Sequence, residues 1–225
     1  MNLWSLYFPE LNQKQIDQFI EYEKKKKKWN SKINLISRKD IANFQIRHLI
    51  HSLSISKFIK FSPKTEILDI GTGGGFPGLP LAILFPDLKF YLIDKIGKKI
   101  NVVNKITNAL ELSNVEPINI NALEFDKKVD FVVSRAVTSM NKFVPLVENN
   151  FKTKNINKIK NGILCLKGGD LKEELKKFDN AQVYKIHTDF PESFFIDKKI
   201  VYLPFWYSID EEILKEEILS TPINA

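Results

Sequence analysis

A run of glycines in the first half of the chain has an acidic residue on either side. Residues 68–78 read LDIGTGGGFPG, and the apolar run Ile67–Ile70 leads into the glycines. Glycine lets a backbone turn sharply and approach a ligand closely. Asp94 ends a second apolar run, 23 residues after Gly71, where its carboxylate can accept hydrogen bonds from both hydroxyls of a ribose. The spacing predicts a nucleoside-binding site at the carboxyl ends of two neighbouring strands.

Two classes of ligand fit this pattern. Residues 73–78 match G-x-G-x-x-G, the signature of dinucleotide-binding enzymes. Asp69, directly before the loop, argues against a pyrophosphate and suits S-adenosylmethionine, which carries a sulfonium and an ammonium group. Too little chain remains outside the predicted sheet for the substrate domain that a dehydrogenase needs. We therefore favour an S-adenosylmethionine-dependent methyltransferase, with a nicotinamide dehydrogenase as the alternative.

Short apolar runs alternating with helical spacers must position these residues. The first five runs, with spacers of βαβ length, are Ile67–Ile70, Phe90–Ile93, Pro117–Ile120, Phe131–Val133 and Ile163–Leu166. Two further runs, Gln182–Ile186 and Ile200–Phe205, are joined by a loop too short for a crossover helix, so they predict an antiparallel pair at the sheet edge. The expected fold is α/β: a class I, Rossmann-like methyltransferase with a mostly parallel sheet and an antiparallel edge strand.

The N-terminal region has a different pattern. Apolar spacing predicts one helix over residues 10–30 and another from about Asp40, a candidate N-cap, to Ile59. We expect a basic helical extension over 1–62, the methyltransferase domain over 63–207 and an acidic tail over 208–225. We find no stretch long and apolar enough for a membrane span and no signal peptide, so we expect a cytoplasmic protein.

The positive charge is confined to this extension. Residues 1–65 carry 13 Lys and Arg against 5 Asp and Glu, a net of +8, whereas residues 66–225 carry 21 against 22, a net of −1. Such asymmetry favours a polyanionic partner. The run Lys24–Lys28, with Lys24, Lys25 and Lys28 as its representatives, is therefore a candidate nucleic-acid contact. A solvated lysine face is the alternative interpretation.

Four segments of the sequence resemble the bacterial small-subunit (16S) ribosomal RNA guanine-N7 methyltransferases, also called RsmG or glucose-inhibited division protein B. The segments are Trp29-Asn30 with Asn34-Leu35-Ile36-Ser37, Arg47-His48 followed by Ser52, Asp69 to Pro80 with its Phe-Pro-Gly continuation, and Ser134-Arg135-Ala136 with Leu166-Lys167-Gly168. This chain departs from the family pattern at Gly74, His51 and Asn121. The resemblance implies transfer of a methyl group from S-adenosylmethionine to N7 of a guanine in 16S ribosomal RNA.

The resemblance also implies roles for individual residues. The residues implied to bind the cofactor are Gly71, Gly73, Gly75, Phe76, Asp94, Ala122, Leu123 and Arg135, with Ala122 and Leu123 flanking the adenine. Arg135 and Lys167 would position the substrate, and Arg47 and His48 would contact the RNA.

Guanine N7 has a lone pair and no proton, so we expect no general base. With a single cysteine, Cys165, the chain can form neither an internal disulfide nor a cysteine-rich metal site, and we expect no metal. The expected partner is ribosomal RNA or the small ribosomal subunit, and the expected state is a monomer. Besides the nicotinamide dehydrogenase, two alternatives remain: a methyltransferase of another substrate, and a non-catalytic RNA-binding assembly factor on the same fold.

Overall fold

The computed structural model describes residues 3–33, 41–135 and 137–205. Three sequence-based predictions fall partly outside these residues. They concern the segment 34–37 together with the candidate N-cap Asp40, the residue Ala136, and the acidic tail 208–225. The strands are β1 (Glu66–Ile70), β2 (Lys89–Ile93), β3 (Val115–Ile118), β4 (Phe131–Arg135), β5 (Gly162–Gly168), β6 (Gln182–Lys185) and β7 (Lys198–Pro204). The longer helices are α2 (Gln13–Asn30), α6 (Gly78–Leu84) and α7 (Gly97–Ala109).

Shorter helical segments complete the chain. They are α1 (Leu3–Tyr7), the π-helical turn η1 (Gln45–Ile50), α4 (His51–Leu53), α5 (Ile55–Phe58), α8 (Met140–Phe143) and α9 (Lys172–Leu175), with 3-10 turns η2 (Ala122–Glu124), η3 (Val144–Leu146), η4 (Glu148–Asn150), η5 (Ile186–Thr188) and η6 (Ser193–Phe195). None of the helices in the described ranges has the length and apolar character needed to cross a bilayer.

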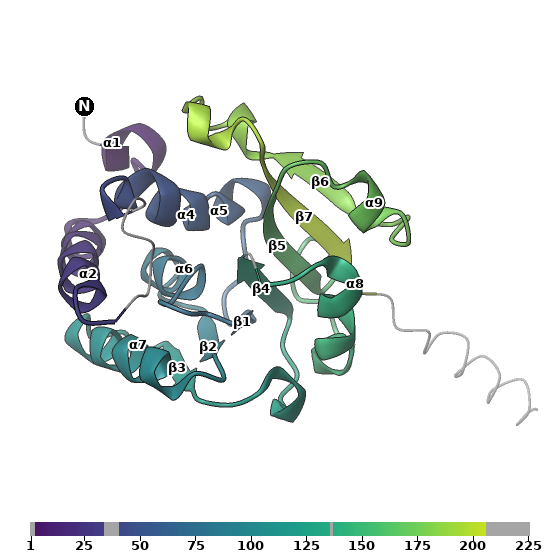
Figure 1. Ribbon diagram of the computed structural model, residues 1–225, viewed down its shortest axis with the longest axis horizontal. Coiled ribbons are helices and arrows are strands. Elements are labelled where there is room, and N and C mark those ends of the chain that lie inside the picture. Colours follow the sequence, from purple (N-terminus) through teal and green to yellow (C-terminus); the bar gives the residue numbers. More distant parts are fainter. Residues whose placement is uncertain (1–2, 34–40, 136, 206–225) are drawn as a thin grey trace, which may run out of the picture.

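The seven strands form one sheet in the order β3-β2-β1-β4-β5-β7-β6 (Figure 1). The first five are parallel, and β7 pairs antiparallel with both β5 and β6. This confirms the predicted mostly parallel sheet with an antiparallel edge. The chain winds outward from β1 in one direction and from β4 in the other. The crevice at this reversal, beyond the carboxyl ends of the strands, is where such folds bind ligands.

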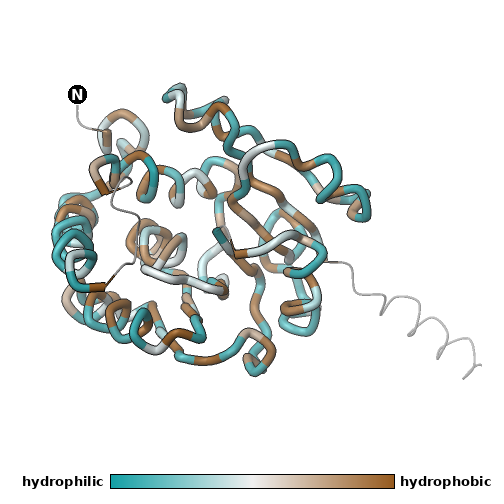
Figure 2. The backbone as a smooth tube through the Cα atoms, in the orientation of Figure 1, coloured by the Kyte–Doolittle hydropathy of each residue, from teal (hydrophilic) through white to brown (hydrophobic). Residues whose placement is uncertain are grey.

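The sheet is buried on both faces, which explains why its strands are near-continuous apolar runs. Along β1, Ile67 packs on one face and Leu68 and Ile70 on the other, following the two-residue repeat of a strand. The central strands are accordingly among the most hydrophobic parts of the backbone (Figure 2). Helices α6 and α7 cover the first face, and α8 lies against the second.

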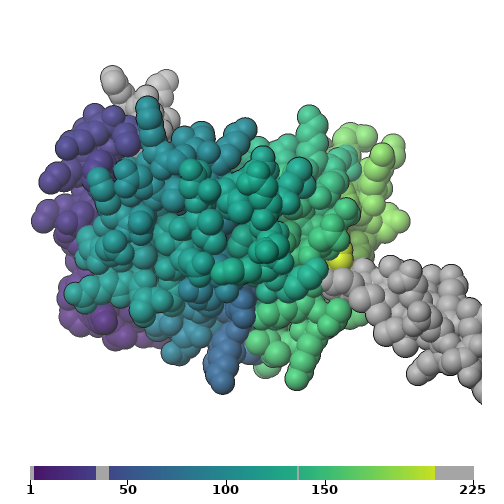
Figure 3. Space-filling view, turned by 90° about the horizontal axis from the view of Figure 1, so that it is seen from below, coloured from purple at the N-terminus to yellow at the C-terminus, as the bar shows by residue number. Residues whose placement is uncertain are grey.

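The N-terminal helices share a core with the sheet. Phe19 and Tyr22 of α2 are fully buried in the same apolar cluster as Ile67 of β1 and Leu79 of α6. Gln15 also donates hydrogen bonds to the carbonyls of Ile83 (2.9 Å) and Leu84 (3.1 Å) at the end of α6. In the space-filling view the purple N-terminal helices abut the teal part of the chain (Figure 3). The basic extension is thus a packed layer of the molecule.

Lys26, in the middle of the lysine run, is completely buried. Its ammonium nitrogen lies 5.3 Å from the ring centroid of Phe76 and 5.7 Å from that of Tyr22, and it has no hydrogen-bond partner among the described residues. Burial lowers the pKa of this amine well below its usual 10.5, because the charged form is poorly solvated there. The interpretation of the whole run as a solvated face is therefore wrong at this position.

Replacing Lys26 with methionine should stabilise the fold by about 1–3 kcal/mol, the usual cost of a buried polar group without a partner. The folded pKa is lowered, so the unfolded chain binds more protons and wild-type stability rises with pH toward 10.5. The advantage of the variant should therefore shrink between neutral pH and pH 10. Urea unfolding at several pH values measures this, with the exposed Lys24→Met variant as control. An advantage that does not change with pH would contradict it.

Candidate cofactor and substrate site

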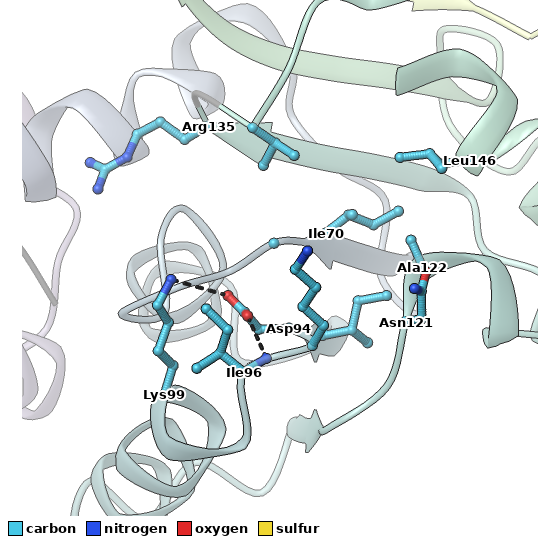
Figure 4. A pocket seen from close by; sticks show the side chains of 12 residues that line it. Ile70, Asp94, Ile96, Lys99, Asn121, Ala122, Arg135 and Leu146 are labelled. Atoms are coloured by element: carbon cyan, nitrogen blue, oxygen red, sulfur yellow. Dashed lines mark hydrogen bonds and ion pairs between the residues drawn. The ribbon is translucent and has the colours of Figure 1, made fainter. Parts of the chain in front are cut away.

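A pocket of about 400 Å³ lies at the carboxyl ends of β1, β2 and β4 (Figure 4). Its volume is within the range of small-molecule sites, roughly 300–1,000 Å³. The residues that line it are Ile70, Gly71, Ile93, Asp94, Lys95, Ile96, Lys99, Asn121, Ala122, Arg135, Val137 and Leu146. Four of the predicted site residues are thus brought together: Gly71, Asp94, Ala122 and Arg135.

The glycine loop takes a conformation that side chains disfavour. Gly71, Gly73 and Gly75 have φ angles of 64°, 56° and 91°, in the left-handed region that favours glycine. A Cβ on Gly71 would lie 2.7 Å from a Val137 methyl, and one on Gly75 would lie 2.4 Å from Leu79. Gly71 lines the pocket, so a bound ligand meets bare backbone there.

Asp69 organises the loop from inside the protein. Its Oδ2 accepts hydrogen bonds from the Thr72 hydroxyl (2.6 Å) and the Gly78 amide (2.8 Å). The carboxyl is fully buried, and burial raises its pKa to about 7. Asp69 is absent from the pocket lining. The preference for a cationic ligand, which was inferred from this carboxylate, stays a prediction.

Asp94 joins the loop to the start of α7. Its Oδ2 accepts a hydrogen bond from the Gly73 amide and its Oδ1 from the Ile96 amide, both at 2.9 Å. The Lys99 ammonium lies 3.9 Å from Oδ2, and Figure 4 shows the contacts of Asp94 with Lys99 and with Ile96 at the pocket wall. Each carboxylate oxygen can accept a second hydrogen bond. The group is thus held in place while keeping acceptor capacity for ribose hydroxyls.

The segment after β3 presents one small side chain to the pocket. Asn121 caps η2 by accepting a hydrogen bond from the Leu123 amide (3.2 Å), and Ala122 lines the pocket. The Leu123 side chain is 70% exposed and does not line it. The turn thus directs the Leu123 side chain into solvent, and its place beside the adenine stays a prediction.

Arg135 ends β4 and lies across the pocket from Asp94 (Figure 4). Its guanidinium carbon is 4.5 Å from the ring centroid of Phe76, and Nη1 donates a hydrogen bond to the carbonyl of Arg47 (3.4 Å). These contacts fix the side chain between the pocket and η1. Arg47 also places its guanidinium 5.6 Å from the ring centroid of Phe194.

Two further candidates lie in the apolar interior instead of the pocket. Phe76 is buried among the rings of Tyr22, Phe44 and His48, with centroid separations of 5.2–5.9 Å. Its side chain supports Arg135 from behind, and the contact of this loop residue with the cofactor stays a prediction. His48 is itself only 8% exposed, and its ring packs in this aromatic cluster. Its contact with RNA stays a prediction.

Lys167 is engaged in a structural link. Its Nζ donates hydrogen bonds to the Thr138 carbonyl and to Glu174 (2.7 Å), and the same Glu174 oxygen accepts from the Met140 amide (2.7 Å). The side chain is absent from the pocket lining. Lys167 thus ties β5 to α8 and α9, and its role in positioning the substrate stays a prediction.

Sequence reasoning missed some residues that line the pocket, among them Ile96, Lys99, Asn121 and Val137. The first two follow Asp94 closely enough to have been included on that basis. Within the described ranges, no group of three or more His, Cys, Asp or Glu side chains could hold a metal ion.

The pocket suits a nucleoside with a charged substituent. Bare glycine backbone, a fixed carboxylate with spare acceptor capacity and apolar walls from Ile70, Ile93 and Ala122 converge on it. On this fold, these features define an S-adenosylmethionine-dependent methyltransferase. Two solved structures share the fold: a SAM-dependent methyltransferase from Aquifex aeolicus (TM-score 0.53, 18% identity, covering 72% of this chain and 93% of that one) and precorrin-6y C5,15-methyltransferase from Geobacter metallireducens (TM-score 0.52, 13%, 78% and 92%).

Sequence comparison narrows the class. Residues 15–197 match the family model described as rRNA small subunit methyltransferase G. Proteins named ribosomal RNA small subunit methyltransferase G are 52% identical over 198 residues in Flavobacterium johnsoniae, covering 88% of this chain and 95% of that protein, and 48% identical over 207 residues in Christiangramia forsetii, covering 92% and 98%. The chain belongs to the rRNA small subunit methyltransferase G family, which confirms the resemblance inferred from its motifs.

Proposed function

We propose that this protein transfers a methyl group from S-adenosylmethionine to N7 of a specific guanine in 16S ribosomal RNA. The observation that carries the proposal is the pocket itself, in which Asp94 and the glycine backbone stand opposite Arg135. Family membership supports the RNA substrate.

When bound, S-adenosylmethionine supplies a methyl group activated by its positively charged sulfur. Asp94 holds the ribose through its spare acceptor sites, and Ala122 provides a flat apolar contact for the adenine. Arg135 binds a phosphate of the RNA, because a cation pressed against the guanine ring would oppose the positive charge that methylation places on it. The residues thus orient two reactants, an effect that can contribute roughly 7–11 kcal/mol to lowering a barrier.

The side chains around the pocket agree with chemistry that needs no general base. Guanine N7 offers an in-plane lone pair and loses no proton. Among the described lining residues there is no histidine, and Asp94 is the sole carboxylate, already engaged by two amides. These residues can bind and orient, as direct attack by N7 requires.

Small subunits from cells lacking this protein provide the test. They should accept label from S-adenosylmethionine when the purified protein is added, and digestion should place the label in 7-methylguanosine at a single position. Label only in protein or in a small metabolite would overturn the proposal. If calorimetry detects no binding of S-adenosylmethionine in the micromolar range, a non-catalytic assembly factor is favoured. If the protein binds NADH, a dehydrogenase is favoured.

A further inference from the structure

The lysine run is electrostatically uneven. Lys24 and Lys25 lie 3.7 and 3.1 Å from Glu21, and Lys27 lies 2.6 Å from Glu23. Lys26 is buried. Lys28 is exposed and has no carboxylate partner among the described residues. Within the lysine run, the uncompensated positive charge is therefore at the C-terminal end of α2.

Two lysines converge on one aromatic ring at this end. The Lys32 ammonium lies 5.6 Å from the ring centroid of Trp29, and the Lys105 ammonium of α7 lies 4.9 Å from the same centroid. Within the described chain, neither lysine forms an ion pair with a carboxylate. Two ammonium groups near the same ring would both attract an anion placed beside it.

Helix α7 extends this positive surface toward the pocket. Its exposed residues Lys98, Asn101, Lys105 and Asn108 recur at spacings of three or four, on one helical face. The helix, GKKINVVNKITNA, contains no acidic residue. Its N-terminal end borders the pocket, because Lys95, Ile96 and Lys99 line it. Over its 13 residues the helix spans about 20 Å, so one face leads from the pocket to Trp29.

We infer that this seam between α2 and α7, with Lys32 and Lys105 at Trp29, Lys28 next to Trp29 in the sequence and Lys98 at the pocket end of α7, binds the phosphate backbone of the RNA strand that carries the target guanine. The inference rests on the proposed function and adds to it the RNA-binding surface. It also narrows the predicted contacts: of Lys24, Lys25 and Lys28, the first two are paired with Glu21 and only Lys28 belongs to the seam.

RNA fits the seam by its chemistry. Ammonium groups attract phosphates irrespective of base sequence, and the asparagines supply donors and acceptors for phosphates and 2′-hydroxyls. Insertion into a lipid surface would require large apolar side chains on the exposed face of α7. Between Lys98 and Asn108 that face carries none. The position beside the pocket suits the nucleotides that flank the methylated base.

A triple variant tests the seam: Lys28→Gln, Lys32→Gln and Lys105→Gln. The matched control removes three charges elsewhere, with Lys176→Gln and Lys177→Gln after α9 and Lys185→Gln on β6, all exposed. Binding to small subunits lacking the modification is measured over a range of KCl concentrations. The triple variant should bind at least about tenfold more weakly than the control at low salt, and the slope of log K against log salt should fall by roughly two units.

Affinity for S-adenosylmethionine should be unchanged in both variants, which excludes loss of folding as the cause. If the triple variant binds RNA as the control does while wild type methylates its substrate, the seam is not the RNA-binding surface. If wild type neither binds nor methylates the subunits, the proposed function itself fails, and the two failures are thus distinct.

Discussion

Replacing Asp94 with alanine should weaken S-adenosylmethionine binding by about 100-fold, since each hydrogen bond to a charged group contributes roughly 1.5–3 kcal/mol. The variant loses the acceptor for the ribose. It also loses the two contacts, from the Gly73 and Ile96 amides, that join the glycine loop to α7. The shape of the glycine loop and the predicted contact with the ribose thus depend on the same carboxylate.

Isothermal calorimetry with S-adenosylmethionine measures this effect. Asp94→Asn separates the two roles, because an amide keeps one acceptor oxygen but loses the charge, and it should bind between wild type and the alanine variant. Asp87→Ala is the matched control, since Asp87 is exposed just before β2, at the opposite end of the strand that Asp94 follows. An Asp94→Ala protein that binds the cofactor as tightly as the control would exclude Asp94 from the site.

The sheet could be predicted because its strands are buried on both sides. Such strands are predicted from continuous apolar runs, without an alternation of apolar and polar residues. The structure places the runs Ile67–Ile70 and Phe131–Val133 in β1 and β4. The third strand was predicted at Pro117–Ile120 but spans Val115–Ile118. It is an edge strand, where Pro117 is tolerated without its backbone donor, so the proline did not mark a boundary.

Side-chain direction separates two candidate cations, Arg135 and Lys167, that both lie at strand ends. Arg135 shares a strand face with Val133, which packs on the α6 side, whereas Lys167 shares a face with Cys165, on the α8 side. The two-residue repeat therefore sends these cations to opposite faces of the sheet. Both residues were predicted as site residues because each is a cation at a strand end. Only the two-residue repeat of the strands distinguishes their directions.

The burial of Lys26 was also readable from helical spacing. Phe19, Tyr22 and Lys26 recur at three and four residues along α2, so the lysine continues the apolar stripe. A run of five lysines obscured that repeat. Conversely, no local pattern shows that Phe76 would turn toward the N-terminal helices, because a loop side chain follows contacts made by residues distant in sequence.

Replacing Arg135 with alanine should lower kcat by roughly 10- to 100-fold, the effect of losing one charge-assisted contact to the substrate. The dissociation constant of S-adenosylmethionine should stay within about threefold of wild type, since the contacts that hold the ribose come from Asp94. The prediction follows from geometry: the guanidinium is supported by Phe76 and by the Arg47 carbonyl, on the side of the pocket opposite Asp94.

Single-turnover methylation and calorimetry on the same preparations separate the two quantities. Lys142→Ala, an exposed position on α8, controls for the loss of one positive charge, and a thermal melt controls for the loss of packing on Phe76. Arg135→Lys should recover only part of the rate, because an ammonium keeps the charge but cannot form the two parallel hydrogen bonds of a guanidinium. If alanine at 135 weakens cofactor binding as much as it slows transfer, Arg135 belongs to the cofactor site instead of the RNA. If the Arg135→Ala variant turns over at the wild-type rate, Arg135 does not orient the guanine, and residues on the other side of the pocket must do so.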